Sequence, residues 1–191
     1  MRLSRAPTQK ILWAGRLDRQ KRVDLLAAVA KAMPSCRFLV FGSVLLSTDT
    51  PALRSLRKLP NVEMKVAYDG FHSLPVEECD LLLYTSQWDG LPNVISEAAA
   101  HGLPIVTSNV GGIAEMINEQ TGYLVEPYDS VPAFVAAISR IIENRQEALE
   151  RAANALEIVR HRHNAAAFRE SLEALPGYLP SDSGKTIELI L

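Results

Sequence analysis

The sequence predicts an α/β fold in which one parallel sheet is covered by helices on both faces. Short apolar runs alternate with segments of helical period along most of the chain, and this alternation is typical of βαβ units. The apolar runs are nearly continuous, as expected for strands that are covered on both faces. The chain has 191 residues, of which 48% are hydrophobic and 22% charged, and this suffices for one compact core.

The first part of the chain predicts five core strands joined by helical connections. The strands are expected at Lys10–Gly15, Arg37–Gly42, Asn61–Val66, Asp80–Thr85 and Leu103–Ser108. Apolar positions three and four residues apart predict a helix between Val23 and Met33. A second helix is expected at Pro51–Lys58 and a short turn-helix around Leu74–Cys79.

After the fifth strand the pattern changes from strands to helices. The elements expected there are a short edge strand at Gly122–Pro127 and amphipathic helices at about Val131–Ile142, Arg145–Val159 and Asn164–Leu175. Asp129 or Ser130 is expected to cap the first of these helices, because a short polar side chain can accept a hydrogen bond from the free amides. Residues 1–176 are therefore expected to form a single domain, followed by a polar tail at 177–191.

The composition disfavours several functions. A formal net charge of -2 gives no electrostatic signature of nucleic-acid binding. No apolar run approaches the roughly 18 residues of a membrane span, and the first residues lack the apolar segment of a signal peptide, so a cytoplasmic protein is expected. Cys36 and Cys79 lie beside predicted strands without metal-ligand spacing and are expected to be buried free thiols.

A ligand is expected at the loops that follow the strands, because open parallel sheets bind ligands at the carboxyl ends of their strands. The loop after the first strand reads GRLDRQKR. Gly15 allows close backbone approach, and Arg16 and Lys21 place two cations that suit a diphosphate. These residues by themselves fit a solvated basic loop equally well.

The loop after the fourth strand opens the stretch TSQWDGLPNVISEAAAHG. Gly90 gives the backbone freedom to turn, and Pro92 suits the first position of a helix at Pro92–His101. Such a helix points its free amides and positive dipole end at the strand ends, which favours a phosphate. Asp89 and Glu97 can then accept hydrogen bonds from sugar or ribose hydroxyls of one ligand. A dipole-stabilising Asp89 and a salt-bridged Glu97 are the alternative.

The loop after the fifth strand reads TSNVGGIAEMI. Gly111 and Gly112 precede a possible short helix at Ile113–Ile117, whose amides would also lie at a strand end, with Glu115 within reach of the same ligand. A plain Gly-Gly turn is the alternative.

The order of these loops resembles the donor-binding half of glycosyltransferase family 4, whose retaining enzymes have the GT-B fold of two facing Rossmann-like domains. The resemblance runs from about Ile11 to Leu172 and rests on GRLDRQK, SQWDGLPNVISEAAAHGLPIV, TSNVGGIAEMI and TGYLVEP. The segment from Asp89 to Glu97 is similar to the Glu-x7-Glu pattern of the family. The resemblance implies a Rossmann-like donor domain, with the N-terminal acceptor-binding domain absent from this chain.

The resemblance also implies roles for individual residues. Arg16 and Lys21 would hold the donor diphosphate and neutralise the leaving nucleotide, and Asp89 would contact the sugar hydroxyls; these are the catalytic candidates. Glu97 would hold the ribose hydroxyls, and Tyr68 would lie against the nucleobase. The other residues expected to bind the donor are Gly15, Gly90, Leu91, Pro92 and Asn93.

The function that the resemblance implies is transfer of a hexose-type sugar from a UDP- or GDP-sugar to a glycan or glycolipid acceptor. The family generally needs no metal, so none is expected. Asp89 departs from the family because it is one methylene shorter than the usual glutamate, and FGSVLLS departs from a Gly-Asp-Gly-Pro-like turn. Without the acceptor domain, the chain is expected to bind donor but to transfer little or nothing. The full-length protein is expected in the cytoplasm or at the inner face of the membrane.

Other functions stay open at this point. The chain could be a non-catalytic nucleotide-sugar binding module, or half of a GT-B-shaped epimerase acting on UDP-N-acetylglucosamine, which would convert its sugar without an acceptor. A dinucleotide dehydrogenase is disfavoured, because no G-x-G-x-x-G follows the first strand.

Overall fold

The fold is a Rossmann-like parallel sheet, seen here in a computed structural model that describes residues 7–43 and 50–178. Most of the predicted tail and part of the FGSVLLS loop lie outside the described residues. The six strands have the order β3-β2-β1-β4-β5-β6, and all neighbours are parallel. The strands are β1 (Lys10–Ala14), β2 (Arg37–Phe41), β3 (Val62–Lys65), β4 (Leu81–Tyr84), β5 (Ile105–Ser108) and β6 (Tyr123–Val125). The predicted fold class is confirmed.

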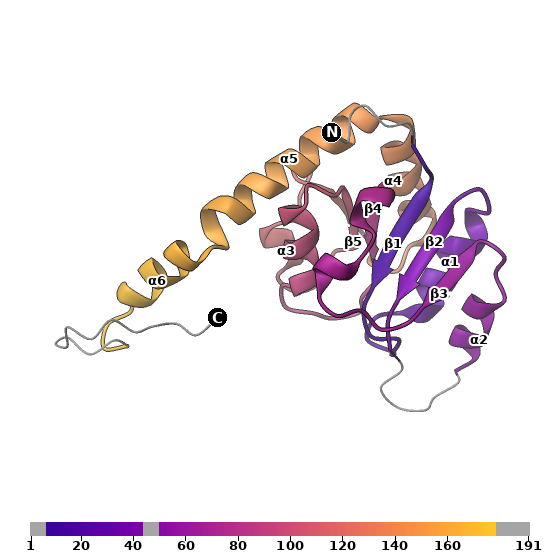
Figure 1. Cartoon of the computed structure of the whole chain (residues 1–191), viewed down its shortest axis with the longest axis horizontal. Coiled ribbons are helices and arrows are strands. Elements are labelled where there is room, and N and C mark those ends of the chain that lie inside the picture. Colours follow the sequence, from indigo (N-terminus) through magenta and orange to yellow (C-terminus); the bar gives the residue numbers. More distant parts are fainter. Residues whose placement is uncertain (1–6, 44–49, 179–191) are drawn as a thin grey trace.

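Helices cover both faces of this sheet (Figure 1). The α-helices are α1 (Val23–Ala32), α2 (Pro51–Arg57), α3 (Asn93–Ala100), α4 (Val131–Glu143), α5 (Arg145–Arg162) and α6 (Ala165–Glu173). Short 3-10 segments are η2 (Phe71–Ser73), η3 (Val76–Glu78) and η4 (Ile113–Glu115). Helices α1, α2 and α4 pack on one face, and α3 and part of α5 pack on the other.

The central strand β1 shows why the predicted strands are nearly continuous apolar runs. Ile11 and Trp13 belong to the core under α1 and α4, whereas Leu12 and Ala14 belong to the core under α3. Successive side chains point to opposite faces, and both faces are covered, so all four residues are buried. Cys36 and Cys79 are also buried, as predicted.

The third strand differs from its prediction as a strand covered on both faces. β3 lies at the edge of the sheet and is only partly buried, and Val66 just after it is 83% exposed. Glu63 forms ion pairs with Arg37 on β2 at 2.5 Å and with Lys65 at 2.8 Å. These charges suit an edge, because they discourage pairing with another chain.

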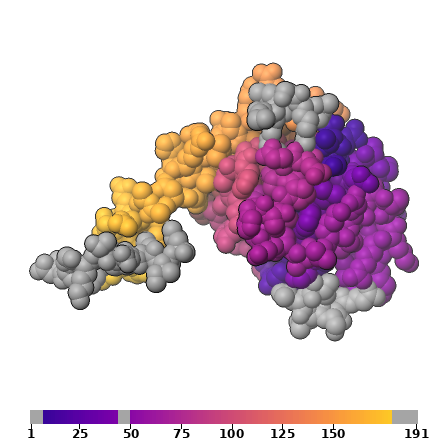
Figure 2. Space-filling model, viewed as in Figure 1, coloured from indigo at the N-terminus to yellow at the C-terminus, as the bar shows by residue number. Residues whose placement is uncertain are grey.

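The chain ends in an arm made of the second half of α5 and of α6. Figures 1 and 2 show this arm, orange to yellow, standing off the rounded body of the protein. α6 has no buried residue, and its Phe168 is 56% exposed. Both helices were predicted, although α5 continues to Arg162 and α6 ends at Glu173. Within the described residues, no helix combines the length and the apolar character that crossing a membrane requires.

Asp80 joins three separate segments of the fold just before β4. Its carboxylate is 2% exposed and accepts hydrogen bonds from the amide of Thr8 at 2.7 Å and from Nη1 of Arg145 at 3.1 Å. Its own amide donates to the carbonyl of Lys10 at 2.9 Å. The start of β1 and the start of α5 are therefore both fastened to β4.

Asp80→Ala is expected to lower the free energy of unfolding by about 3 kcal/mol, because the change removes the buried carboxylate that pairs with Arg145, whose side chain is 19% exposed, and that accepts the amide of Thr8. Urea denaturation measures the loss. Asp69→Ala, which removes an exposed aspartate, is the matched control and is expected to change stability by less than about 0.5 kcal/mol. Equal effects of the two substitutions would show that Asp80 does not hold these segments together.

Candidate functional site

The strand order reverses between β1 and β4, and a cavity opens at their carboxyl ends. Chain connections leave these two neighbouring strands in opposite directions, which creates a crevice where open α/β sheets bind ligands. The cavity has a volume of about 400 Å³. Seven of the ten predicted site residues line it, namely Gly15, Arg16, Lys21, Tyr68, Asp89, Pro92 and Asn93. The sequence therefore located about half of the residues that line this cavity.

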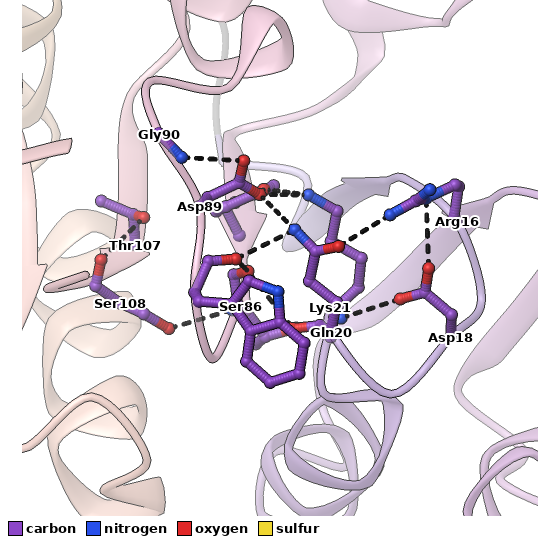
Figure 3. A network of polar contacts seen from close by, with 12 residues as sticks. Arg16, Asp18, Gln20, Lys21, Ser86, Asp89, Gly90, Thr107 and Ser108 are labelled. Atoms are coloured by element: carbon purple, nitrogen blue, oxygen red, sulfur yellow. Dashed lines mark hydrogen bonds and ion pairs between the residues drawn. The ribbon is translucent and has the colours of Figure 1, made fainter. Parts of the chain in front are cut away.

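Asp89 is the centre of a polar network in this cavity (Figure 3). Its Oδ2 atom accepts hydrogen bonds from Nζ of Lys21 at 2.5 Å, from the hydroxyl of Tyr84 at 2.5 Å and from Nε2 of Gln20 at 3.3 Å. Its Oδ1 atom accepts from the amide of Gly90 at 3.2 Å. The side chains of Lys21 and Asp89 are only 12% and 19% exposed, so solvent screens their attraction weakly.

These donors stabilise the ionised form of Asp89. Burial acts to raise the pKa of its carboxyl, but the hydrogen bonds from Lys21 and Tyr84 and the charge of Lys21 outweigh burial. The pKa of Asp89 consequently lies below its ordinary value. The carboxylate is therefore an acceptor at neutral pH and not a proton donor.

The backbone that carries Lys21 is fastened to the segment after β4. Thr85 donates its hydroxyl to the carbonyl of Lys21 at 2.8 Å and accepts from the indole of Trp13 at 3.0 Å. The amide of Gln87 donates to the carbonyl of Gln20 at 2.9 Å. These bonds fix the loop after β1 against the loop after β4. The backbone of Lys21 is therefore held in place independently of the contacts that its side chain makes.

Arg16 lies at the mouth of the same cavity. Its side chain is 49% exposed and forms an ion pair with Asp18 at 3.1 Å. Its Nη2 donates to Oε1 of Gln20 at 2.7 Å, and Nε2 of Gln20 donates to the carbonyl of Trp88 at 3.0 Å. Arg16 thus belongs to the network around Asp89 (Figure 3), while much of its guanidinium faces solvent and can meet an anion.

The amino end of α3 also reaches the cavity. The helix begins at Asn93 and ends at Ala100, one residue inside each predicted bound, because Pro92 is extended and acts as the N-cap. No side chain caps the first amides, and Pro92, Asn93 and Val94 all line the cavity. Uncapped amides at a helix start attract anions through their hydrogen bonds and the helix dipole.

Gly111 and Gly112 support the Asp89 loop from behind and are not among the residues that line the cavity. The amide of Gly112 donates to the carbonyl of Gly90 at 3.2 Å. Gly111 has a φ of +56°, and a Cβ there would lie 1.7 Å from the carbonyl oxygen of Asp89. Their role is structural, and the helix after them is the short η4, which does not bring Glu115 to the cavity lining.

Three predicted residues do not line the cavity. Gly90 and Leu91 follow Asp89 but are not among the lining residues. Glu97 lies one turn inside α3, where its charge and the burial of Tyr68 together raise the pKa of that phenol, burial being the larger cause. Glu97 therefore lies within electrostatic reach of Tyr68, in the predicted base region.

Sequence reasoning missed Tyr84, Gln20 and Gly42. A Cβ on Gly42 would lie 2.1 Å from the carbonyl oxygen of Gly15, so the ends of β1 and β2 approach closely only because this residue is glycine. Tyr84 had a usable signal, since it is the one polar-tipped side chain in the apolar run LLLY and lies at its carboxyl end. Gln20 had none, because glutamine is common in solvated loops.

Comparison with known proteins indicates the family of this chain. The family described as Glycosyl transferases group 1 matches residues 8–144. Lipopolysaccharide 1,6-galactosyltransferase of Escherichia coli K12 is 26% identical over 147 residues, which are 71% of this chain and 40% of that protein. The O-antigen biosynthesis glycosyltransferase WbnH of Escherichia coli is 33% identical over 121 residues, or 61% of this chain and 33% of that protein.

A solved structure agrees with the fold. HepE of Anabaena, crystallised with UDP and glucose, has a TM-score of 0.75 and 23% identity to this chain, and the match covers 87% of this chain and 48% of that one. The chain thus spans less than half the length of each of these three proteins. Because the family match extends over well more than half of the chain, this chain belongs to the Glycosyl transferases group 1, and its sheet has the fold of a GT-B C-terminal domain.

Proposed function

We propose that this chain binds the nucleotide-sugar donor of a retaining glycosyltransferase that moves a hexose-type sugar from a UDP- or GDP-sugar to a glycan or glycolipid acceptor. One observation carries the proposal: a single cavity at the strand reversal holds Arg16, Lys21, the amino end of α3 and Asp89. Cations and free amides suit a diphosphate, and an ionised carboxylate suits sugar hydroxyls.

The same groups suit the chemistry of transfer. As the bond from sugar to diphosphate breaks, positive charge develops on the sugar and negative charge on the departing diphosphate. Lys21 and the amides of Asn93 and Val94 are fixed before reaction, so they stabilise the leaving group without having to reorganise. Asp89 accepts hydrogen bonds from the sugar and moves no proton, in keeping with its lowered pKa.

The rest of the enzyme is part of the proposal. We infer that a second domain binds the acceptor and closes over the cavity, because electrostatic stabilisation of a leaving group is strongest where water is excluded. This chain alone is accordingly expected to bind donor and to transfer little or no sugar. The two cations supply the charge neutralisation, and the proposal includes no metal ion.

Calorimetric titration with UDP, GDP and NAD tests the proposal. Saturable binding of UDP or GDP, with no binding of NAD, is the expected result and identifies the nucleotide. Preference for NAD, or binding of none of the three by a folded chain, would contradict the proposal. Conversion of a bound nucleotide sugar to its epimer without any acceptor would indicate the epimerase instead.

A further inference from the structure

Tyr84 is a buried strand residue whose hydroxyl nevertheless reaches the candidate site. It is the last residue of β4 and is only 1% exposed, with its ring in the core under α3. Nevertheless it lines the cavity, and its hydroxyl contacts both Lys21 and Asp89. Packing of the ring therefore fixes where the hydroxyl stands.

The chemistry of the three groups determines the direction of each hydrogen bond. An ammonium can only donate and a carboxylate can only accept, so the hydroxyl of Tyr84 accepts from Lys21 and donates to Oδ2 of Asp89. Nζ of Lys21 also lies 4.8 Å from the centre of the Tyr84 ring, in cation–π contact. Burial, followed by the bond to Asp89, raises the pKa of Tyr84, so the phenol stays protonated and remains a donor.

This arrangement leaves particular atoms for a ligand. Lys21, Tyr84 and Gln20 all donate to Oδ2 of Asp89, whereas Oδ1 accepts only the backbone amide of Gly90 among the contacts of the described residues. Lys21 uses two of its three N–H groups on Asp89 and Tyr84. Oδ1 of Asp89 can thus accept one more hydrogen bond, and one N–H of the Lys21 ammonium is left to donate.

We propose that Tyr84 is a positioning residue for donor recognition: its hydroxyl holds Asp89 and Lys21 in one arrangement, so that Oδ1 of Asp89 meets a sugar hydroxyl while Lys21 meets the diphosphate. The inference rests on the proposed function and adds a residue that acts through Asp89 and Lys21. Its effect falls on the sugar more than on the nucleotide, because Lys21 keeps its ion pair with Asp89 when the hydroxyl is removed.

Tyr84→Phe tests the inference, since it removes one oxygen and keeps the ring that packs in the core. Calorimetry compares the free nucleotide with its sugar-linked form, using UDP, UDP-glucose and UDP-galactose, or GDP and GDP-mannose if GDP is bound. Affinity for the nucleotide sugar that the wild type binds best is expected to fall about 10-fold, and affinity for the free nucleotide by less than about 3-fold.

The pH dependence of sugar-nucleotide binding gives a second readout that loss of packing would not change. The groups that face Asp89 are Lys21 and Gln20 from the loop after β1, Tyr84 from β4 and the amide of Gly90. Without the phenol, the pKa of Asp89 rises, because one donor to its ionised form is gone. Binding is therefore expected to weaken at a higher pH in Tyr84→Phe than in the wild type as the solution is acidified.

Tyr123→Phe is the matched control. Tyr123 is a buried strand tyrosine of the same sheet, and its hydroxyl has no hydrogen-bond partner within the described part of the chain. This variant is expected to bind both ligands as the wild type does. If Tyr84→Phe binds both ligands as the wild type does, or weakens both equally with an unchanged pH profile, the inference is wrong while the proposed function stands. If the wild type binds no nucleotide, both are wrong.

Discussion

Lys21→Ala is expected to weaken nucleotide binding about 100-fold, the largest loss from any single side chain in the cavity. Nζ of Lys21 is mostly buried, and a charged hydrogen bond in such a place contributes up to about 3 kcal/mol, which corresponds to this factor. The change also leaves Asp89 without its cation, so an unpaired carboxylate then faces the diphosphate and repels it. Calorimetry with UDP or GDP measures the effect.

Two further variants separate these causes. Lys31→Ala removes an exposed lysine from the last turn of α1 and is expected to change affinity by less than about 2-fold. Lys21→Ala combined with Asp89→Ala is expected to bind the free nucleotide more tightly than Lys21→Ala alone, because the repelling carboxylate is gone. Nucleotide affinity within about 3-fold of the wild type in Lys21→Ala would refute the assignment of Lys21 to the diphosphate.

Gly111→Ala is expected to lower the free energy of unfolding by about 3 kcal/mol and to abolish measurable nucleotide-sugar binding. An alanine at φ +56° is strained by about 1 kcal/mol. Its Cβ would also lie 1.7 Å from the carbonyl oxygen of Asp89; the Cβ is fixed by its own backbone and the oxygen is a backbone atom, so neither can move aside cheaply. The loop that carries Asp89 must shift, and this displaces the carboxylate from Lys21. Urea denaturation and calorimetry measure the two effects.

Gly102→Ala provides the control for backbone strain. Gly102 has a nearly identical φ of +61°, but a Cβ there meets nothing within 4 Å. Its substitution is expected to lower stability by about 1 kcal/mol and to leave binding unchanged. Should the two alanine variants prove equal in stability and in affinity, the contact between Gly111 and Asp89 would have no role in shaping the site.

The sequence predicted the sheet well because burial leaves a direct mark on composition. Strands covered on both faces must be apolar at every position, and LLLY of β4 reads this way. The same rule gave a wrong prediction for β3, which was expected to be covered on both faces. Its run NVEMKV contains Glu63 and Lys65 and lies at an edge of the sheet. Position within a sheet depends on contacts between distant segments, and a local pattern does not record them.

The site was predictable as a set of loops but not as a network. Strand ends and glycines indicate where a ligand meets the backbone, and the residues expected there do gather at one cavity. The contact of Lys21 with Asp89 joins residues 68 positions apart, and no local sequence pattern indicates such a contact. Glu97 lies one turn inside α3 and is not among the residues that line the cavity, so its assignment to the ribose stays a prediction.

The reversal of strand order between β1 and β4 has a consequence for how this site can diversify. Arg16 and Lys21 belong to the half of the sheet that begins with β1, whereas Asp89 and Tyr84 belong to the half that begins with β4. Under the proposed function, both halves meet the diphosphate that all nucleotide sugars share, the first through Arg16 and Lys21 and the second through the amides at the start of α3, whereas Asp89 contacts the variable sugar. Substitutions next to Asp89 can therefore alter sugar preference while Arg16, Lys21 and the α3 amides continue to hold the nucleotide.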